Sequence, residues 1–155
     1  MNTSARSAST PAQNANTLLT RFQKELHEFL QEEKRSAWLL VDNGSRLGKD
    51  TRYIDTYVRS SYRLDAKRYE IGRTIRTFDL ASIEIDPASR GKNNFEAIMK
   101  IIYEELAAYN TRALSETYKY KAVFVECVNN YPLYQHILRE YKALNWGVNS
   151  LYIYI

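Results

Sequence analysis

Cysteine and histidine are scarce in this sequence, which contains only Cys127, His27 and His136. A single cysteine cannot form a disulfide within the chain, and these three residues cannot supply the cysteine-rich ligand set of a zinc cluster. We therefore expect a domain that needs neither a disulfide nor a bound metal. Because disulfides persist mainly in oxidising compartments, the scarcity of cysteine also favours a cytoplasmic protein.

Long apolar runs are also absent. No window approaches the roughly 18 apolar residues that a membrane helix needs, and residues 1–16 lack the apolar segment of a signal peptide. We expect no membrane partner, a disordered N-terminal tail over residues 1–16 and one domain over residues 17–155. A chain of 155 residues has the length of one domain, which can bury about 70% of its unfolded surface.

The net charge is +4 and is concentrated in one segment. Residues 46–76 hold nine Lys and Arg against four Asp and Glu, and four tyrosines lie among them: Tyr53, Tyr57, Tyr62 and Tyr69. A basic, Tyr-rich face can hold phosphates and stack on bases, which favours an anionic partner such as a nucleic acid. An ordinary solvated surface explains these charges equally well, and strand alternation would bury about half of the rings.

Hydrophobic periodicity predicts alternating helices and strands in one domain. Strands are expected at residues 38–41, 53–64, in a long stretch ending near 86, and at 122–128 and 150–155; helices are expected at residues 17–35, after Asn93, and from Asn130 and Pro132 to near Gly147. The run at residues 122–128 is almost continuously apolar, which is typical of a strand buried on both faces. The expected strand-helix-strand order in the middle of the chain indicates a right-handed crossover between parallel strands.

The long strand that ends near residue 86 changes its apolar phase. Its apolar residues are even-numbered at Phe78 and Leu80 but odd-numbered at Ile83 and Ile85. A strand has a period of two, so the phase can change only where one residue is inserted. We therefore predict a β-bulge near residues 81–82.

The loop that leads from this strand into the next helix is a candidate anion site. A helix N-terminus presents free backbone amides and the positive end of the helix dipole, both of which suit a phosphate. Arg90 and Lys92 add positive charge to the loop. By itself this pattern is a weak signal, because every crossover needs a loop and loops are often basic.

The segments LASIEIDPASRGKNNFEAIM and VFVECVNN resemble the GNAT acyltransferase superfamily, in which a strand ending in a hydrophobic-x-Pro pattern meets an Arg-Gly-x-Gly-x-Gly-like loop. The resemblance implies a single α/β domain with a GNAT-like fold. It would have a mixed, mostly antiparallel sheet, a central parallel strand-helix-strand crossover, and helices on both faces. The resemblance also implies acetyl-CoA as cosubstrate and an N-acetyltransferase activity toward an amine acceptor that the sequence does not identify.

The resemblance assigns cofactor-binding residues by position. The loop and helix N-terminus would hold the pyrophosphate, the backbones of two strand residues would accompany the pantetheine, and an asparagine before the last helix would lie beside the cofactor. These residues are Arg90, Gly91, Lys92, Asn93, Asn94 and Phe95, then Ile83 and Ile85, then Asn130. Asn93 and Phe95 stand where the family has its later glycines. Asn tolerates a left-handed backbone, whereas Phe95 must either turn into the core or weaken the cofactor site.

Acyl transfer to an amine needs a base for the ammonium proton and an acid for the leaving thiolate. Glu84 on the bulged strand is the preferred base, directly or through water, and Glu126 is the second candidate; either residue is also explained as a structural carboxylate. The resemblance places the acid on a tyrosine of the last helix, and we prefer Tyr134 because Tyr141 falls on the apolar stripe. His136 is a weaker catalytic candidate.

Two non-catalytic functions stay open. The first is a GNAT-like interaction protein that has lost catalysis and binds a host protein or nucleic acid through the basic, Tyr-rich face; small proteins of this plan are similar to phage and mobile-element products. The second is a homo-oligomer, because the last strand, residues 150–155, is an apolar segment that would need a partner at a sheet edge.

Overall fold

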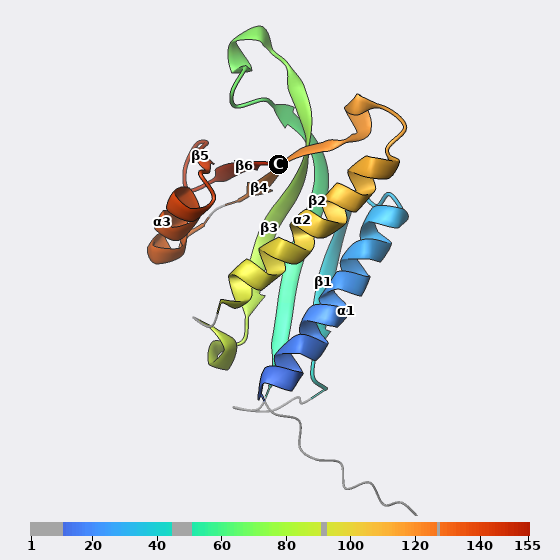
Figure 1. The fold of residues 1–155 in the computed structure, drawn as a ribbon. Helices are drawn as coiled ribbons and strands as arrows, with labels where there is room; N and C mark the ends of the chain where they lie inside the picture. The colour runs from blue at the N-terminus through green and yellow to red at the C-terminus, as the bar shows by residue number, and fades with distance from the viewer. Residues whose placement is uncertain (1–10, 45–50, 91–92, 127) are drawn as a thin grey trace, which may run out of the picture.

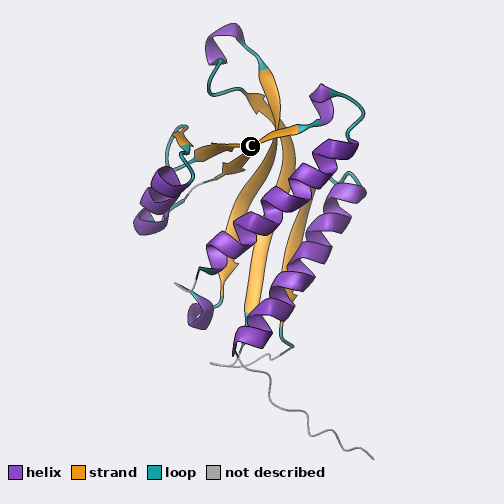
Figure 2. Cartoon of the chain, viewed as in Figure 1, coloured by secondary structure: helices purple, strands orange, loops and turns teal. Residues whose placement is uncertain are grey.

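The computed structural model describes residues 11–44, 51–90, 93–126 and 128–155. Within these ranges the chain forms helices packed on a six-stranded sheet, as Figures 1 and 2 show. The helices are α1 (Pro11–Gln31), α2 (Asn94–Arg112) and α3 (Tyr131–Glu140). The strands are β1 (Ser36–Asp42), β2 (Tyr53–Leu64), β3 (Thr74–Ile85), β4 (Tyr120–Val125), β5 (Leu144–Asn145) and β6 (Leu151–Tyr154), with short 3-10 turns at η2 (Tyr69–Ile71), η3 (Pro87–Ser89) and η4 (Glu116–Tyr118).

The sheet has the order β1-β2-β3-β4-β6-β5, and β3 and β4 are its parallel pair. The remaining neighbours are antiparallel. Helix α2 joins the two parallel strands, which confirms the strand-helix-strand crossover and the mixed, mostly antiparallel sheet expected from the sequence. No helix in the described part of the chain is long and apolar enough to cross a membrane.

The helices α1, α2 and α3 share one face of the sheet, contrary to the expectation of helices on both faces. One continuous core contains residues of all three helices, such as Phe22, Ile102 and Ile137, together with Val123 and Ile153 from β4 and β6. Figure 1 shows α1 and α2 side by side across the strands. The cavity described below lies between this helical layer and the sheet.

The opposite face of the sheet is covered by its own side chains among the described residues. Phe124 and Tyr152 pack together there, and the Arg63 guanidinium lies 4.1 Å from the Phe124 ring centroid. Asp79 is fully buried on this face because Arg63 and the hydroxyl of Thr77 donate to its carboxylate. This layer of aromatic rings and paired charges takes the place of a helix, an arrangement that residue periodicity alone does not predict.

The predicted β-bulge is confirmed. Tyr57 of β2 pairs with Ser82, and the next residue, Val58, pairs with Leu80, so that Ala81 is the extra residue in β3. Because of the insertion, Ile83 packs on the helical side of the sheet, as Leu80 does before the bulge. The change of apolar phase in the sequence therefore has the physical cause that we inferred.

Two helix boundaries differ from the sequence expectation. Helix α1 begins at Pro11, before the start at residue 17 expected from periodicity; proline suits the first position of a helix. Helix α3 ends at Glu140 rather than near Gly147, because Lys142 has a left-handed backbone with φ 50° and the chain then enters β5. The sequence pattern did not predict β5, which is only two residues long.

The terminal strand β6 is not a sheet edge. It lies between β4 and β5, and its residues Leu151, Tyr152 and Ile153 are buried. The edges of the sheet are β1 and β5. Contrary to the expectation, the terminal strand is therefore not an exposed edge that needs a partner chain, because it pairs with β4 on one side and β5 on the other.

Candidate cofactor and active site

Strands β3 and β4 separate part-way along their length. Their pairing ends at Leu80 and Val125, where the backbone N–H of Glu126 makes a last hydrogen bond of 3.1 Å to the Leu80 carbonyl. Strand β3 continues to Ile85 with β2 as its neighbour among the described strands. Its edge toward β4 is thus left open after the bulge, which frees backbone groups for another partner.

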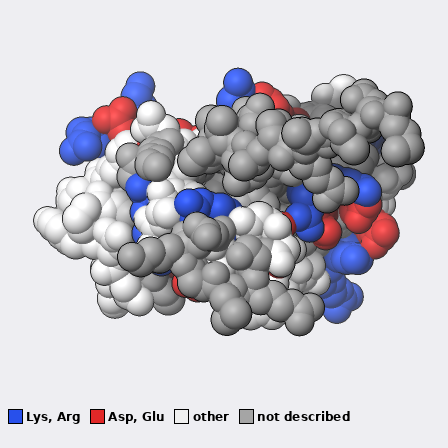
Figure 3. Space-filling model, turned by 90° about the horizontal axis from the view of Figure 1, so that it is seen from below, with Lys and Arg blue, Asp and Glu red and all other residues white. Residues whose placement is uncertain are grey.

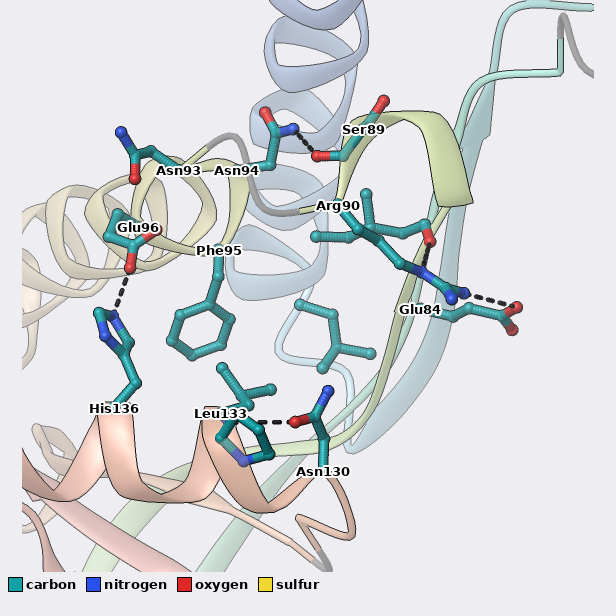
Figure 4. A pocket seen from close by; sticks show the side chains of 13 residues that line it. Glu84, Ser89, Arg90, Asn93, Asn94, Phe95, Glu96, Asn130, Leu133 and His136 are labelled. Atoms are coloured by element: carbon teal, nitrogen blue, oxygen red, sulfur yellow. Dashed lines mark hydrogen bonds and ion pairs between the residues drawn. The ribbon is translucent and has the colours of Figure 1, made fainter.

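A cavity of about 540 Å³ lies at this separation (Figure 4). Its walls come from the end of β3, from the loop and first turn of α2, and from the start of α3. The predicted cofactor residues that line it are Ile83, Ile85, Arg90, Asn93, Asn94, Phe95 and Asn130. Gly91 and Lys92 lie outside the described residues. The cavity thus collects residues from three separate elements, as a ligand site requires.

Asn93 precedes α2 with a left-handed backbone, φ 60° and ψ 22°. This conformation explains how an asparagine replaces a glycine at this point of the loop. The Asn93 side chain makes no hydrogen bond that caps the helix. The side-chain amide of Asn94 instead donates to the Ser89 carbonyl, which ties the first residue of the helix back to η3.

Phe95 turns into the core and also borders the cavity. It is 9% exposed, and its ring meets the Tyr141 ring edge-on with the centroids 6.0 Å apart. Of the two outcomes considered for this residue, the structure thus shows the inward one. The bulk of Phe95 is directed toward α3, as Figure 4 shows, and the start of α2 stays accessible from the cavity.

Arg90 reaches back over the end of β3. Its Nε donates a hydrogen bond of 2.8 Å to the Ile85 carbonyl, and its Nη2 lies 3.9 Å from Glu84 Oε1. The side chain is 58% exposed. The guanidinium therefore lies at the mouth of the cavity and keeps most of its donors available to an anionic ligand.

Glu84, the preferred base, is one of the residues that line the cavity. Its Oε1 accepts a 2.9 Å hydrogen bond from the Tyr53 hydroxyl, which raises the pKa of Tyr53. Asp55 stands opposite Glu84 across the strands, and burial, followed by the Glu84 charge, raises the pKa of Asp55. The Glu84 side chain is 57% exposed, and its charged neighbours are Asp55 and the Arg90 guanidinium.

Glu126, the second candidate base, is bound by two guanidinium groups. It forms ion pairs with Arg59 and with Arg63, the latter at 2.7 Å. It is not among the described residues that line the cavity. These contacts hold β2 against the end of β4, on the sheet face away from the helices, and so favour a structural role for Glu126.

The three candidates on α3 and at its C-cap, Tyr141, occupy different environments. The Tyr134 hydroxyl accepts a hydrogen bond from the Asn145 side chain, and Tyr134 is buried and not among the described cavity-lining residues. Tyr141 contacts the rings of Phe95 and His136, and burial, followed by the nearby Glu96 and Glu140 charges, raises its pKa. His136 itself lines the cavity and is paired with Glu96 Oε1.

Asn130 caps helix α3 beside the cavity. Its Oδ1 accepts a 3.1 Å hydrogen bond from the Leu133 backbone N–H, as Figure 4 shows. The capping bond fixes the side chain at the wall of the cavity. Within the described residues, no group of three or more His, Cys, Asp or Glu side chains is arranged to hold a metal ion.

Comparison of the sequence finds no matching family model and no matching curated protein. Among solved structures, the chain is similar to one from a KacTA–DNA complex, with a TM-score of 0.51 and 14% identity, over 84% of this chain and 79% of that one. The chain has a GNAT-like fold. A second similar structure is a point mutant of the AtaT toxin bound to the C-terminus of the antitoxin AtaR and acetyl-CoA, with a TM-score of 0.41 and 15% identity over 67% of this chain and 66% of that one.

Several side chains of the basic, Tyr-rich segment are paired with acids from other parts of the domain. Arg59 and Arg63 bind Asp79 and Glu126, and the Tyr53 hydroxyl donates to Glu84. Figure 3, which views the molecule from below, shows blue and red atoms in small separate groups among the described residues. Arg59 and Arg63, two cations of this segment, are therefore engaged in ion pairs within the protein.

One buried acid next to the cavity-lining residues was not singled out from the sequence. Asp86 is fully buried at the end of β3, and its carboxylate accepts hydrogen bonds from Ser89 and from the backbone of Tyr53. A local signal was present, because an aspartate directly before Pro87 is a typical cap for a following helical turn. The contact with Tyr53 joins residues far apart in the sequence and left no local pattern.

Proposed function

We propose that the protein is an N-acetyltransferase that moves the acetyl group of acetyl-CoA to an amine by direct attack. The observation that carries this proposal is the cavity where β3 and β4 separate, bordered by the start of α2, in a GNAT-like fold. A strand edge with free backbone groups and a helix N-terminus suit the two halves of an acyl-CoA, an amide-bearing arm and a set of phosphates.

In this proposal each half of the cosubstrate has its own residues. The phosphates bind at the start of α2, with Asn93 and Asn94, and take the exposed guanidinium of Arg90. The pantetheine amides bind along the open backbone edge at Ile83 and Ile85. Arg90 then releases the Ile85 carbonyl, because the pantetheine arm needs that acceptor.

The chemical step needs a base for the amine of the acceptor and an acid for the leaving CoA thiolate. Glu84 accepts a proton from the ammonium form of the acceptor, and the free amine nitrogen attacks the thioester carbonyl carbon. The carbon–nitrogen bond forms, the attacking nitrogen loses its second proton to solvent water, and the carbon–sulfur bond breaks. The CoA thiolate leaves and is protonated by an acid that solvent water later reprotonates. We assign that last proton to Tyr134, whose hydroxyl must first give up its contact with Asn145; Tyr141, which packs on Phe95, is the comparison residue.

Binding of acetyl-CoA, measured by titration calorimetry, tests the first half of the proposal. We expect saturable binding by the wild-type protein and about tenfold weaker binding by Arg90→Ala, because a charge-assisted phosphate contact is lost. Lys100→Ala is the matched control, since Lys100 is an exposed cation further along α2, with its side chain 78% exposed. Absence of binding by the intact wild-type protein would contradict the proposal.

Transfer of a labelled acetyl group to a panel of amines tests the second half. We expect Glu84→Gln to lower the rate about 100-fold with little change in acetyl-CoA affinity, because loss of a general base acts on the chemical step. Tyr134→Phe and Tyr141→Phe, assayed side by side, decide which hydroxyl protonates the thiolate. A Glu84→Gln protein with wild-type activity would exclude Glu84 as the base.

A binding role without catalysis is the second candidate function, and one surface feature favours it. Trp38 and Leu40 are 65% and 54% exposed on the edge strand β1, and Trp38 packs on Tyr57 with ring centroids 4.7 Å apart. Exposed apolar residues grouped in this way are typical of an interface with another protein. This candidate predicts that the wild-type protein fails to bind acetyl-CoA and that Trp38→Ala abolishes capture of its partner.

A further inference from the structure

Asp86 is a buried acid whose contacts all lie within the protein. Its Oδ1 accepts a 3.0 Å hydrogen bond from the Tyr53 backbone N–H, and its Oδ2 accepts one of 3.0 Å from the Ser89 backbone N–H. The Ser89 hydroxyl donates to the same carboxylate at 2.8 Å, and Arg52 Nε lies 3.9 Å away. Asp86 is fully buried and is not among the described cavity-lining residues, so it is not placed to touch a substrate.

The hydrogen bonds of Asp86 lead into the wall of the cavity. Ser89, which Asp86 holds through two groups, accepts a hydrogen bond at its own carbonyl from the side chain of Asn94. Both Ser89 and Asn94 line the cavity, and Asn94 is the first residue of α2. A continuous path of hydrogen bonds thus runs from β2, through Asp86 and Ser89, to the start of the helix.

The other wall of the cavity is held independently of Asp86. Ile83 and Ile85 lie in β3, where they pair with Thr56 and Ile54 of β2 in the regular antiparallel ladder. The backbone pairs of this ladder do not include the Asp86 carboxylate, which contacts β2 only at the N–H of its first residue, Tyr53. A change at Asp86 should therefore move the start of α2 relative to the strand and leave the strand itself in place.

We propose that Asp86 is a positioning residue that sets the affinity for the phosphate-bearing half of acetyl-CoA without affecting the pantetheine half. This inference rests on the proposed function. An ionised carboxylate is expensive to bury, and three donors converge on this one to offset that cost. The carboxylate fixes the distance between the strand edge and the start of α2, which a ligand that spans both of them requires.

The test compares two ligands on three proteins by NMR titration, which measures weak as well as tight binding. The ligands are CoA and pantetheine, which lacks the phosphates, and the proteins are wild type, Asp86→Asn and Asp65→Asn. Asp65 is the matched control because it is also buried, accepts the Lys67 backbone N–H at 3.0 Å and the Tyr154 hydroxyl, and lies in the β2–β3 turn.

For Asp86→Asn we expect CoA to bind about tenfold more weakly and pantetheine to change less than about twofold, because only the start of α2 is displaced. Asparagine keeps one acceptor oxygen and turns an N–H₂ group toward the second donor. For Asp65→Asn we expect both affinities to stay at the wild-type value. Equal weakening of both ligands in Asp86→Asn, or no weakening of either, would overturn the inference.

Ser89→Ala repeats the test if Asp86→Asn does not fold. It removes one donor and keeps the Ser89 backbone N–H, so CoA should bind roughly threefold more weakly with pantetheine unchanged. Unchanged CoA binding in Ser89→Ala together with an unfolded Asp86→Asn would show Asp86 to be structural only and would overturn the inference. A wild-type protein that does not bind CoA contradicts the proposed function itself, and the inference then falls with it.

Discussion

The two ends of β3 show opposite uses of the same strand. At its first residues β3 is paired with β4, and the Arg76 guanidinium, in a side chain 8% exposed, donates to the Tyr109 hydroxyl at 2.7 Å and to the Tyr118 carbonyl at 2.9 Å. It also pairs with Glu33 at 3.1 Å and lies 4.3 Å from the centroid of the Tyr120 ring. At its last residues β3 has left β4, and Ile83 and Ile85 face a cavity. We call these the closed end and the open end.

The comparison indicates that the closed end of β3 contributes stability, whereas the open end keeps polar groups available to a ligand. At the closed end, donors and acceptors are satisfied within the protein, which rigidifies the helix and strand ends there. At the open end, the bulge at Ala81 and the early end of the β3–β4 pairing leave backbone groups and the Arg90 guanidinium available. Changes at the two ends should therefore affect different measurements.

The largest effect is expected at the closed end. Arg76→Ala should lower the free energy of unfolding by about 3 kcal/mol, because the Tyr118 carbonyl loses its donor and the Tyr109 and Tyr120 rings lose the guanidinium packed against them. The Tyr109 hydroxyl and Glu33 keep only their contact with each other. Urea unfolding measures the loss, with Arg139→Ala as an exposed control. Acetyl-CoA affinity of the folded Arg76→Ala protein should not change. A loss of affinity without a loss of stability would reverse the assignment of the two ends.

The second largest effect is expected at Tyr120 of the closed end, where alkaline pH should lower the free energy of unfolding. Burial raises the pKa of Tyr120 to about 12 from an ordinary value of 10.0. The folded protein thus holds this proton more tightly than the unfolded chain, so the stabilisation is complete below pH 10 and is lost as the pH rises through 12. Urea unfolding at pH 9 and pH 11 should show a smaller loss for Tyr120→Phe than for wild type, although the variant also loses a hydrogen bond to Ser60. An equal loss of unfolding free energy in Tyr120→Phe and wild type would contradict a raised pKa at Tyr120.

A smaller effect is expected from the cap of α3 at the open end. Asn130→Ala should lower the free energy of unfolding by about 1 kcal/mol, because the Leu133 N–H loses its acceptor. It should also weaken acetyl-CoA binding, since Asn130 forms part of the cavity wall. Asn130→Ser, which keeps a capping oxygen, separates the two effects: stability should return, and binding should stay weakened if the amide touches the ligand. If Asn130→Ser restored both stability and acetyl-CoA binding, the role of Asn130 would be to cap α3 and not to bind the ligand.

The smallest effect is expected at Asn93. Asn93→Gly should change the free energy of unfolding by less than about 1 kcal/mol and leave acetyl-CoA binding intact, because glycine adopts φ 60° without strain. Asn93→Val, which disfavours a left-handed backbone, should weaken binding more than it weakens folding. Calorimetric titrations of the two variants provide the measurement. If Asn93→Val binds acetyl-CoA as wild type does, the conformation at Asn93 has no part in the site.

Much of the fold could be predicted from local patterns, and the exceptions have a common cause. The bulge at Ala81 follows from the phase change between Leu80 and Ile83, and the cavity-lining loop follows from its resemblance to a known family. The packing of all three helices on one face was not predictable, because it depends on the opposite face being covered by Arg63 over Phe124, two residues far apart in the chain.

The candidate site shows the same division between residues that a local pattern predicted and residues whose roles depend on long-range contacts. Four of the residues assigned by their place in the loop, Arg90, Asn93, Asn94 and Phe95, line the cavity. Asp86 was missed because its bond to Tyr53 bridges distant residues. The choice between Tyr134 and Tyr141 likewise depends on the partners Asn145 and Phe95, which spacing along α3 does not reveal. Contacts between residues far apart in the chain, which leave no local pattern, are therefore the part of the site that the sequence did not predict.

The central claim is that the open end of β3 binds acetyl-CoA, and backbone NMR of the wild-type protein titrated with acetyl-CoA tests it most directly. The account predicts saturable chemical-shift changes grouped at Ile83 to Ile85 and Asn93 to Glu96, with the signals of Arg76, Tyr109 and Tyr120 unmoved. Absence of binding, or shifts centred on the Arg76 end, would contradict the account.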